Sequence, residues 1–195
     1  MSEPAGGTID FFEILGVDAN TNIGSIRNTY KKKMKSLVQE IAGVRITDDR
    51  FDHYLIEIAK LNAAAWVLRD NEKRDAYVRE RDELTELEKQ WHALSPDDKD
   101  AHDRLRRTFD AKVKTFLSKY VEETVLEAGL DREVAEASRW SPAHTRHATK
   151  LLREYRQRVY HDILERLPFH EVTPPKVDWD ERAATVDSLI AGGAA

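Results

Sequence analysis

The sequence of 195 residues contains no cysteine, only 6 prolines and 8 glycines, and no long hydrophobic run. Without cysteine the chain cannot form a disulfide, use a catalytic thiolate or bind zinc through sulfur. No apolar stretch approaches the roughly 20 residues that cross a bilayer, and the first residues lack the basic and apolar regions of a signal peptide. We therefore expect a cytoplasmic protein that does not insert into a membrane.

The chain also lacks the common sequence signatures of enzymes. It has no glycine-rich phosphate loop, no G-x-S-x-G nucleophile elbow and no dinucleotide-binding fingerprint. Its net charge of −5 provides no general attraction to nucleic acid. We therefore predict a protein that is not an enzyme, holds no cofactor and does not bind nucleic acid.

Charge and helical periodicity are what the chain has in abundance. Charged residues make up 34% of it and hydrophobic residues 41%, a composition typical of helix-rich proteins with charged outer faces. Apolar residues recur at spacings of three and four, and no stretch sustains a period of two. We predict an all-α fold with helices over about 11–15, 23–41, 50–68, 72–93, 95–129, 131–139, 141–167 and 178–190.

These helices suggest an organisation in two units. We predict an N-terminal unit over 9–81 built on an antiparallel helix pair, a bridging helix over 82–94 and a C-terminal helical domain over 95–167. A proline-containing linker (168–178) and an amphipathic terminal helix (179–191) complete the chain. Serine followed by proline is a strong helix start, so we expect helices to begin at Ser95-Pro96 and Ser141-Pro142.

Two segments of the N-terminal unit stand out. Residues 10–17 read D-F-F-E-I-L-G-V, and residues 61–77 read L-N-A-A-A-W-V-L-R-D-N-E-K-R-D-A-Y. They resemble the J-domain, the module by which DnaJ-type co-chaperones engage DnaK-type ATPases. The family has D-Y-Y-x-x-L-G-V at the first segment and A-Y-x-V-L-S-D-P-x-K-R-x-x-Y over the end of the second. The resemblance implies an antiparallel helix pair with a short first helix packed on it.

The predicted helix over 23–41 extends the resemblance. Ile26 and Tyr30 have the apolar-then-tyrosine spacing of the family's second helix. The family's second helix contacts its partner through a basic face, and the resemblance places this partner-binding face at Arg27, Lys31, Lys32 and Lys35. The alternative is that the Lys31 to Lys35 run is a solvated helix face and nothing more.

The chain departs from the family at the tripeptide His-Pro-Asp, on which the activity of J-domains rests. The register of Ile26 and Tyr30 places this tripeptide at Val38, Gln39 and Glu40. Because Val38 and Gln39 are ordinary helix residues, we expect the helix to continue to near Gly43 instead of ending at a proline. We therefore predict a non-enzymatic J-like adaptor or scaffold that binds a protein partner and does not stimulate ATP hydrolysis by the usual route.

Other interpretations stay open at this point. One is a functional co-chaperone of a DnaK-type ATPase with a client-binding C-terminal domain. In another, the protein partner is a second J-like protein, and a homo-oligomer of this chain is one form of that interpretation. Another is a metal-binding or enzymatic helical bundle, for which His144 and His147, spaced i and i+3, are weak candidate ligands. Nucleic-acid binding through Lys31 to Lys35 would show itself as steep salt dependence.

Overall fold

The computed structural model describes residues 9–45, 49–95, 97–165 and 167, and every regular element among these residues is helical. The predicted all-α fold is therefore confirmed. None of the described helices combines the length and hydrophobicity needed to cross a bilayer. The elements are α1 (Phe11–Leu15), α2 (Ile23–Ile41), α3 (Asp49–Leu68), α4 (Asn71–Ala93), α5 (Lys99–Leu117), the π-helix η1 (Ser118–Glu123), α6 (Thr124–Leu130), α7 (Arg132–Ser138) and α8 (Pro142–Glu165).

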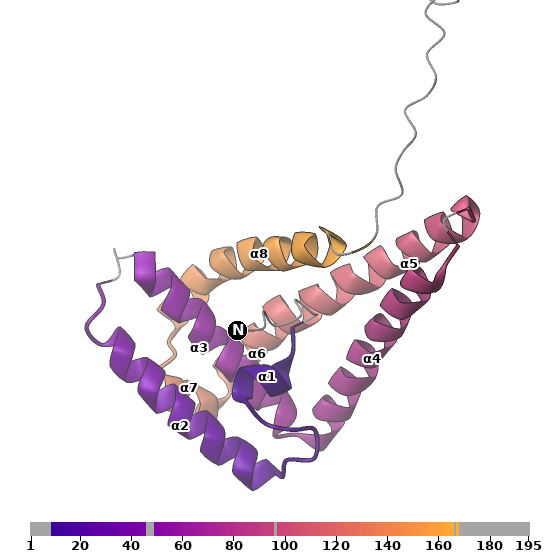
Figure 1. Cartoon of the computed structure of the whole chain (residues 1–195). Helices are drawn as coiled ribbons and strands as arrows, with labels where there is room; N and C mark the ends of the chain where they lie inside the picture. The colour runs from indigo at the N-terminus through magenta and orange to yellow at the C-terminus, as the bar shows by residue number, and fades with distance from the viewer. Residues whose placement is uncertain (1–8, 46–48, 96, 166, 168–195) are drawn as a thin grey trace, which may run out of the picture.

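Helices α2 and α3 run antiparallel, and α1 packs against both of them (Figure 1). The Asp10 carboxylate begins α1 by accepting a hydrogen bond from the Phe12 N–H at 2.8 Å, and Gly16 ends it in the left-handed region at a φ of 68°. Helix α2 runs without a break to Ile41. The predicted continuation of this helix through residues 38–40 is thus confirmed.

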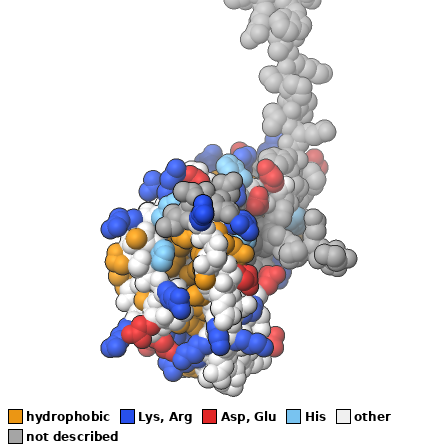
Figure 2. All heavy atoms as spheres, turned by 90° about the vertical axis from the view of Figure 1, so that its left-hand side faces the viewer, with side chains coloured by type: hydrophobic (Ala, Val, Ile, Leu, Met, Phe, Trp, Pro, Cys, Tyr) orange, Lys and Arg blue, Asp and Glu red, His pale blue; other side chains and the backbone are white. Residues whose placement is uncertain are grey.

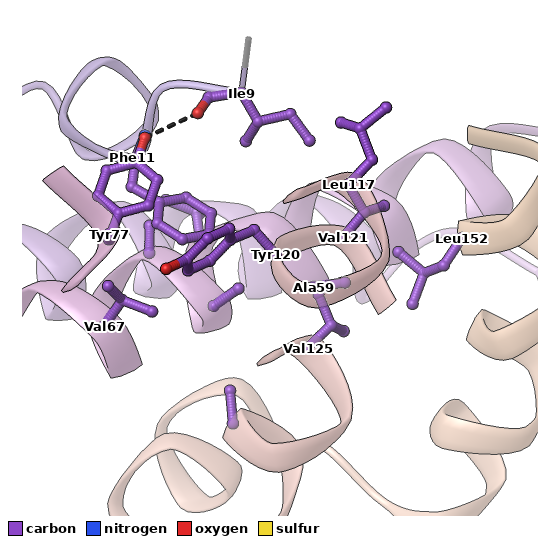
Figure 3. Packing of buried hydrophobic residues seen from close by; sticks show 14 of the residues in the cluster. Ile9, Phe11, Ala59, Val67, Tyr77, Leu117, Tyr120, Val121, Val125 and Leu152 are labelled. Carbon is purple, nitrogen blue, oxygen red and sulfur yellow. Dashed lines mark hydrogen bonds between the residues drawn. The ribbon is translucent and has the colours of Figure 1, made fainter. Parts of the chain in front are cut away.

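Tyr77 of α4 contacts the start of α1. Its hydroxyl donates to the Ile9 carbonyl at 2.7 Å and accepts from the Phe11 N–H at 3.0 Å, and burial raises its pKa well above the ordinary value. Figure 3 shows the ring of Tyr77 beside Phe11 and Tyr120, with ring centroids 4.7 Å and 5.1 Å away. Aromatic stacking and two buried hydrogen bonds therefore hold the start of the fold in place.

The second half of the chain closes onto α3. Helices α4 and α5 form an antiparallel hairpin that projects from the α2–α3 pair, and α6, α7 and α8 all pack on α3 (Figure 1). One cluster of buried hydrophobic residues draws on both halves, among them the core residues that Figure 3 shows from α3, α5, α6 and α8. The predicted division at residues 81 and 82 falls inside the unbroken α4, and separate domains stay a prediction.

The predicted start at Ser95-Pro96 is wrong, because α5 begins four residues later at Lys99. The Asp98 carboxylate caps α5 by accepting from the Ala101 N–H at 3.0 Å, whereas the Ser95 carbonyl accepts from the Asp98 N–H in a preceding turn. The predicted start at Ser141-Pro142 is confirmed by α8. The linker over 168–178 and the terminal helix over 179–191 lie outside the described residues.

Candidate docking groove

A buried hydrogen-bond network holds α7 against the α2–α3 pair. The Tyr30 hydroxyl of α2 donates to Asn62 Oδ1 of α3 at 2.8 Å, and Asn62 Nδ2 donates to Ser138 Oγ of α7 at 3.1 Å. The Ser138 hydroxyl in turn donates to the Val134 carbonyl at 2.7 Å. The Tyr30 hydroxyl also lies 3.3 Å from the Val134 carbonyl. Because Tyr30, Asn62 and Ser138 are all buried, these hydrogen bonds satisfy polar groups that water does not reach.

Ion pairs at the start of α7 strengthen this attachment. Arg69 at the end of α3 contacts Asp131 Oδ2 at 2.6 Å and Glu133 Oε2 at 3.0 Å. Burial alone would raise the pKa of Asp131, but hydrogen bonds from the Val134 N–H and from Arg69 hold that pKa below its ordinary value. Asp131 is therefore charged where it caps α7 by accepting from the Val134 N–H.

The predicted basic face of α2 is divided by α7. Lys31 lies 3.4 Å and Arg27 4.0 Å from the Glu133 carboxylate, so these two cations face an acidic side chain of the same molecule. Lys32 and Lys35 are exposed, and within the described part of the chain neither has an ion-pair partner. Only part of this face is therefore free to attract an acidic partner.

An open groove lies between α2 and α7 and continues toward the start of α3. Its polar part encloses about 560 Å³, and an apolar end encloses about 170 Å³. Val38 and Arg139 line both parts, so the two parts adjoin. The polar part is lined by Lys31, Lys35, Val38, Gln39, Glu133, Glu136, Ala137 and Arg139, and the apolar end by Val38, Ile41, Ala42, Phe51, Leu55, Ile58, Ser138, Arg139, Trp140 and His144.

Figure 2 looks onto the end of the molecule where α2 and α3 are joined. Hydrophobic side chains show in the middle of this face, and Lys and Arg side chains, with some Asp and Glu among them, surround these. We call the hollow defined above the docking groove. An apolar floor with cationic edges is suited to the hydrophobic face of an acidic amphipathic element.

The three residues at the tripeptide position belong to this groove to different degrees. Val38 is partly buried against the core and lines both parts of the groove, and Gln39 is exposed in its polar part. Glu40 is exposed and accepts a hydrogen bond from the Ser36 hydroxyl one turn earlier at 3.2 Å. Val38 thus contributes packing surface and offers no hydrogen-bonding side chain.

Arg139 and Trp140 are groove residues that the sequence does not reveal. Arg139 ends α7 in the left-handed region at a φ of 53°, a conformation that costs a non-glycine residue about 1–2 kcal/mol. Its guanidinium has no ion-pair partner among the described residues. The Trp140 indole is buried and donates to Thr145 Oγ1 at 2.9 Å, which fixes the wall beside Arg139.

The two histidines considered as metal ligands have other roles. His144 completes a capping box at the start of α8, because its Nδ1 accepts from the Ser141 N–H at 3.1 Å and its own N–H donates to Ser141 Oγ at 3.4 Å. His147 Nε2 lies 2.6 Å from Asp52 Oδ1 of α3. The part of the chain that the structure describes holds no group of three or more potential metal ligands.

The comparisons with known proteins leave the chain without an assigned family. Neither a protein-family model, nor a curated protein, nor a solved structure matches it. The resemblance to J-domains therefore rests on the sequence segments alone and enters the next section as part of a proposal.

Proposed function

We propose that this chain is a non-enzymatic, cytoplasmic J-like adaptor that binds an acidic, amphipathic surface of a protein partner in the docking groove. The observation that carries the proposal is the unbroken course of α2 through Val38, which makes this residue of the tripeptide position part of the floor of an open groove. An apolar floor provides affinity by removing hydrophobic surface from water, and the cations at its edge select for negative charge.

The same contacts argue against stimulation of a DnaK-type ATPase. A residue at position 38 that cannot form hydrogen bonds is unable to act as the family's histidine. In addition, Glu133 of α7 partly neutralises Arg27 and Lys31, so the face that the resemblance assigns to the ATPase is weakened. What remains is a surface suited to docking.

A site-specific crosslinking experiment tests the docking role. A photo-reactive phenylalanine analogue is introduced at Gln39, which lines the groove, and in a second variant at Lys89, which is exposed on α4 outside the groove. In host cells we expect a crosslinked partner at position 39 only, with acidic residues at the crosslinked site. Equal crosslinking at both positions, or a basic partner site, would refute the proposal.

The second candidate is a functional co-chaperone, favoured by the exposure of Lys32 and Lys35 on α2. In that case the partner is the ATPase itself and the C-terminal helices bind a client. The two functions differ in one observable, the rate at which a DnaK-type ATPase hydrolyses bound ATP in the presence of this chain.

A further inference from the structure

We propose that the docking groove binds residues 178–190 of a second copy of this chain, so that two copies exchange their C-terminal segments. This inference rests on the proposed docking role of the groove and names its partner. The segment lies outside the described residues, and only its sequence enters the argument.

The sequence of this segment complements the groove in both hydrophobicity and charge. With helical spacing, its apolar residues fall on one stripe: Trp179, Ala183, Val186 and Ile190. Four acidic residues accompany a single basic one, Arg182, in this segment. The groove offers the opposite charge, because Lys35 and Arg139 at its edges have no ion-pair partner in the described part of the chain. Its two acidic lining residues are already paired, Glu133 with Arg69 and Glu136 with Arg132.

The lengths of the two surfaces agree. The groove follows α2 from Lys31 to Ala42, which at a rise of about 1.5 Å per residue is about 16 Å. The apolar stripe from Trp179 to Ile190 also spans about 16 Å in a helix. A helix laid in a hydrophobic groove is a common mode of peptide recognition, and a tryptophan at one end of the stripe is the typical anchor.

The geometry of α8 favours a second copy over the chain's own segment. Helix α8 begins beside the groove, where His144 is part of the lining, and ends at Glu165, about 35 Å along its axis. The 12 residue steps from Leu167 to Trp179 reach at most about 40 Å when fully extended. Reaching its own groove thus requires nearly full extension, whereas reciprocal exchange closes a two-fold dimer.

A direct binding measurement tests the contact. A fluorescent peptide of residues 176–191 is titrated with the full chain carrying Trp179→Ala, so that the chain's own segment does not compete. We expect saturable binding that Lys35→Glu weakens about tenfold, equivalent to about 1.4 kcal/mol. Lys89→Glu is the matched control, since it makes the same charge change at an exposed position of α4 outside the groove and should leave the affinity unchanged. Absent binding, or equal loss in both variants, overturns the inference.

Sedimentation of the full chain tests the second copy. At tens of micromolar we expect a dimer that Trp179→Ala or Lys35→Glu each converts to a monomer. A monomeric wild-type chain, or a dimer that survives both substitutions, overturns the exchange even if the peptide binds. If the peptide fails to bind while position 39 still crosslinks an acidic partner, this inference falls and the proposed function stands.

Discussion

Removing the Tyr30 hydroxyl is the sharpest perturbation of the network that holds the groove wall. In Tyr30→Phe, Asn62 Oδ1 loses the donor that lies 2.8 Å away and stays buried beside α7. A buried polar group left without its hydrogen bond costs about 1–3 kcal/mol. We therefore expect the free energy of unfolding to fall by that amount, and Asn62→Leu to cost about 2–4 kcal/mol because it removes two hydrogen bonds.

The double variant separates a network from two independent contacts. Tyr30→Phe together with Asn62→Leu replaces both partners by apolar groups, so its cost should be clearly smaller than the sum of the single costs. Urea unfolding followed by circular dichroism and by tryptophan fluorescence measures all three variants. Thr108→Ala, which removes an exposed hydrogen bond within α5, is the control and should change stability by less than about 0.5 kcal/mol. The reasoning would be refuted if the double variant lost as much stability as the two single variants together. It would also be refuted if the single variants were as stable as the wild type.

Three further predictions follow from single contacts. Gly129→Ala, a change that usually stabilises a helix by about 1 kcal/mol, should here lower the melting temperature, because the new Cβ would lie 2.6 Å from the Trp140 indole nitrogen; a rise would contradict that contact. Tyr77→Phe leaves the buried Phe11 N–H without its acceptor and should cost about 1–3 kcal/mol in urea unfolding, and an unchanged midpoint would count against the role of Tyr77. Burial lowers the pKa of His144 from its ordinary 6.5, so the neutral ring stabilises the fold fully above that pH and less as the pH falls below it. The stability lost in His144→Ala should therefore shrink between about pH 7.5 and about pH 5.5, and a constant loss would contradict the capping role of the neutral ring.

Local signals in the sequence were sufficient to predict most helices. Helices α1 and α2 have the predicted bounds, and α7 differs from its predicted range by one residue at each end. Each of these features depends on neighbours within one helical turn. The wrong start at Ser95-Pro96 also has a local cause. Asp98 competes with Ser95 as the capping residue of α5, and its carboxylate accepts a hydrogen bond from an N–H of the first turn.

The groove could not be predicted, because its two walls are far apart in the sequence. Lys31 meets Glu133 across about a hundred residues, and no local pattern indicates that α7 lies against α2. Arg139 and Trp140 have no helical period to mark them, since they connect two helices. The sequence did indicate that the tripeptide position stays helical, but not that Val38 would line a groove.

Single-turnover hydrolysis by the host's DnaK-type ATPase tests the central claim most directly. The purified full chain is added to the ATPase preloaded with ATP, and the rate of hydrolysis is compared with that of the ATPase alone. Because Val38 replaces the family's histidine and Glu133 engages Arg27 and Lys31, we predict an unchanged rate. A clear acceleration that is lost on replacing Lys32 and Lys35 with alanine would contradict the adaptor and establish a functional co-chaperone.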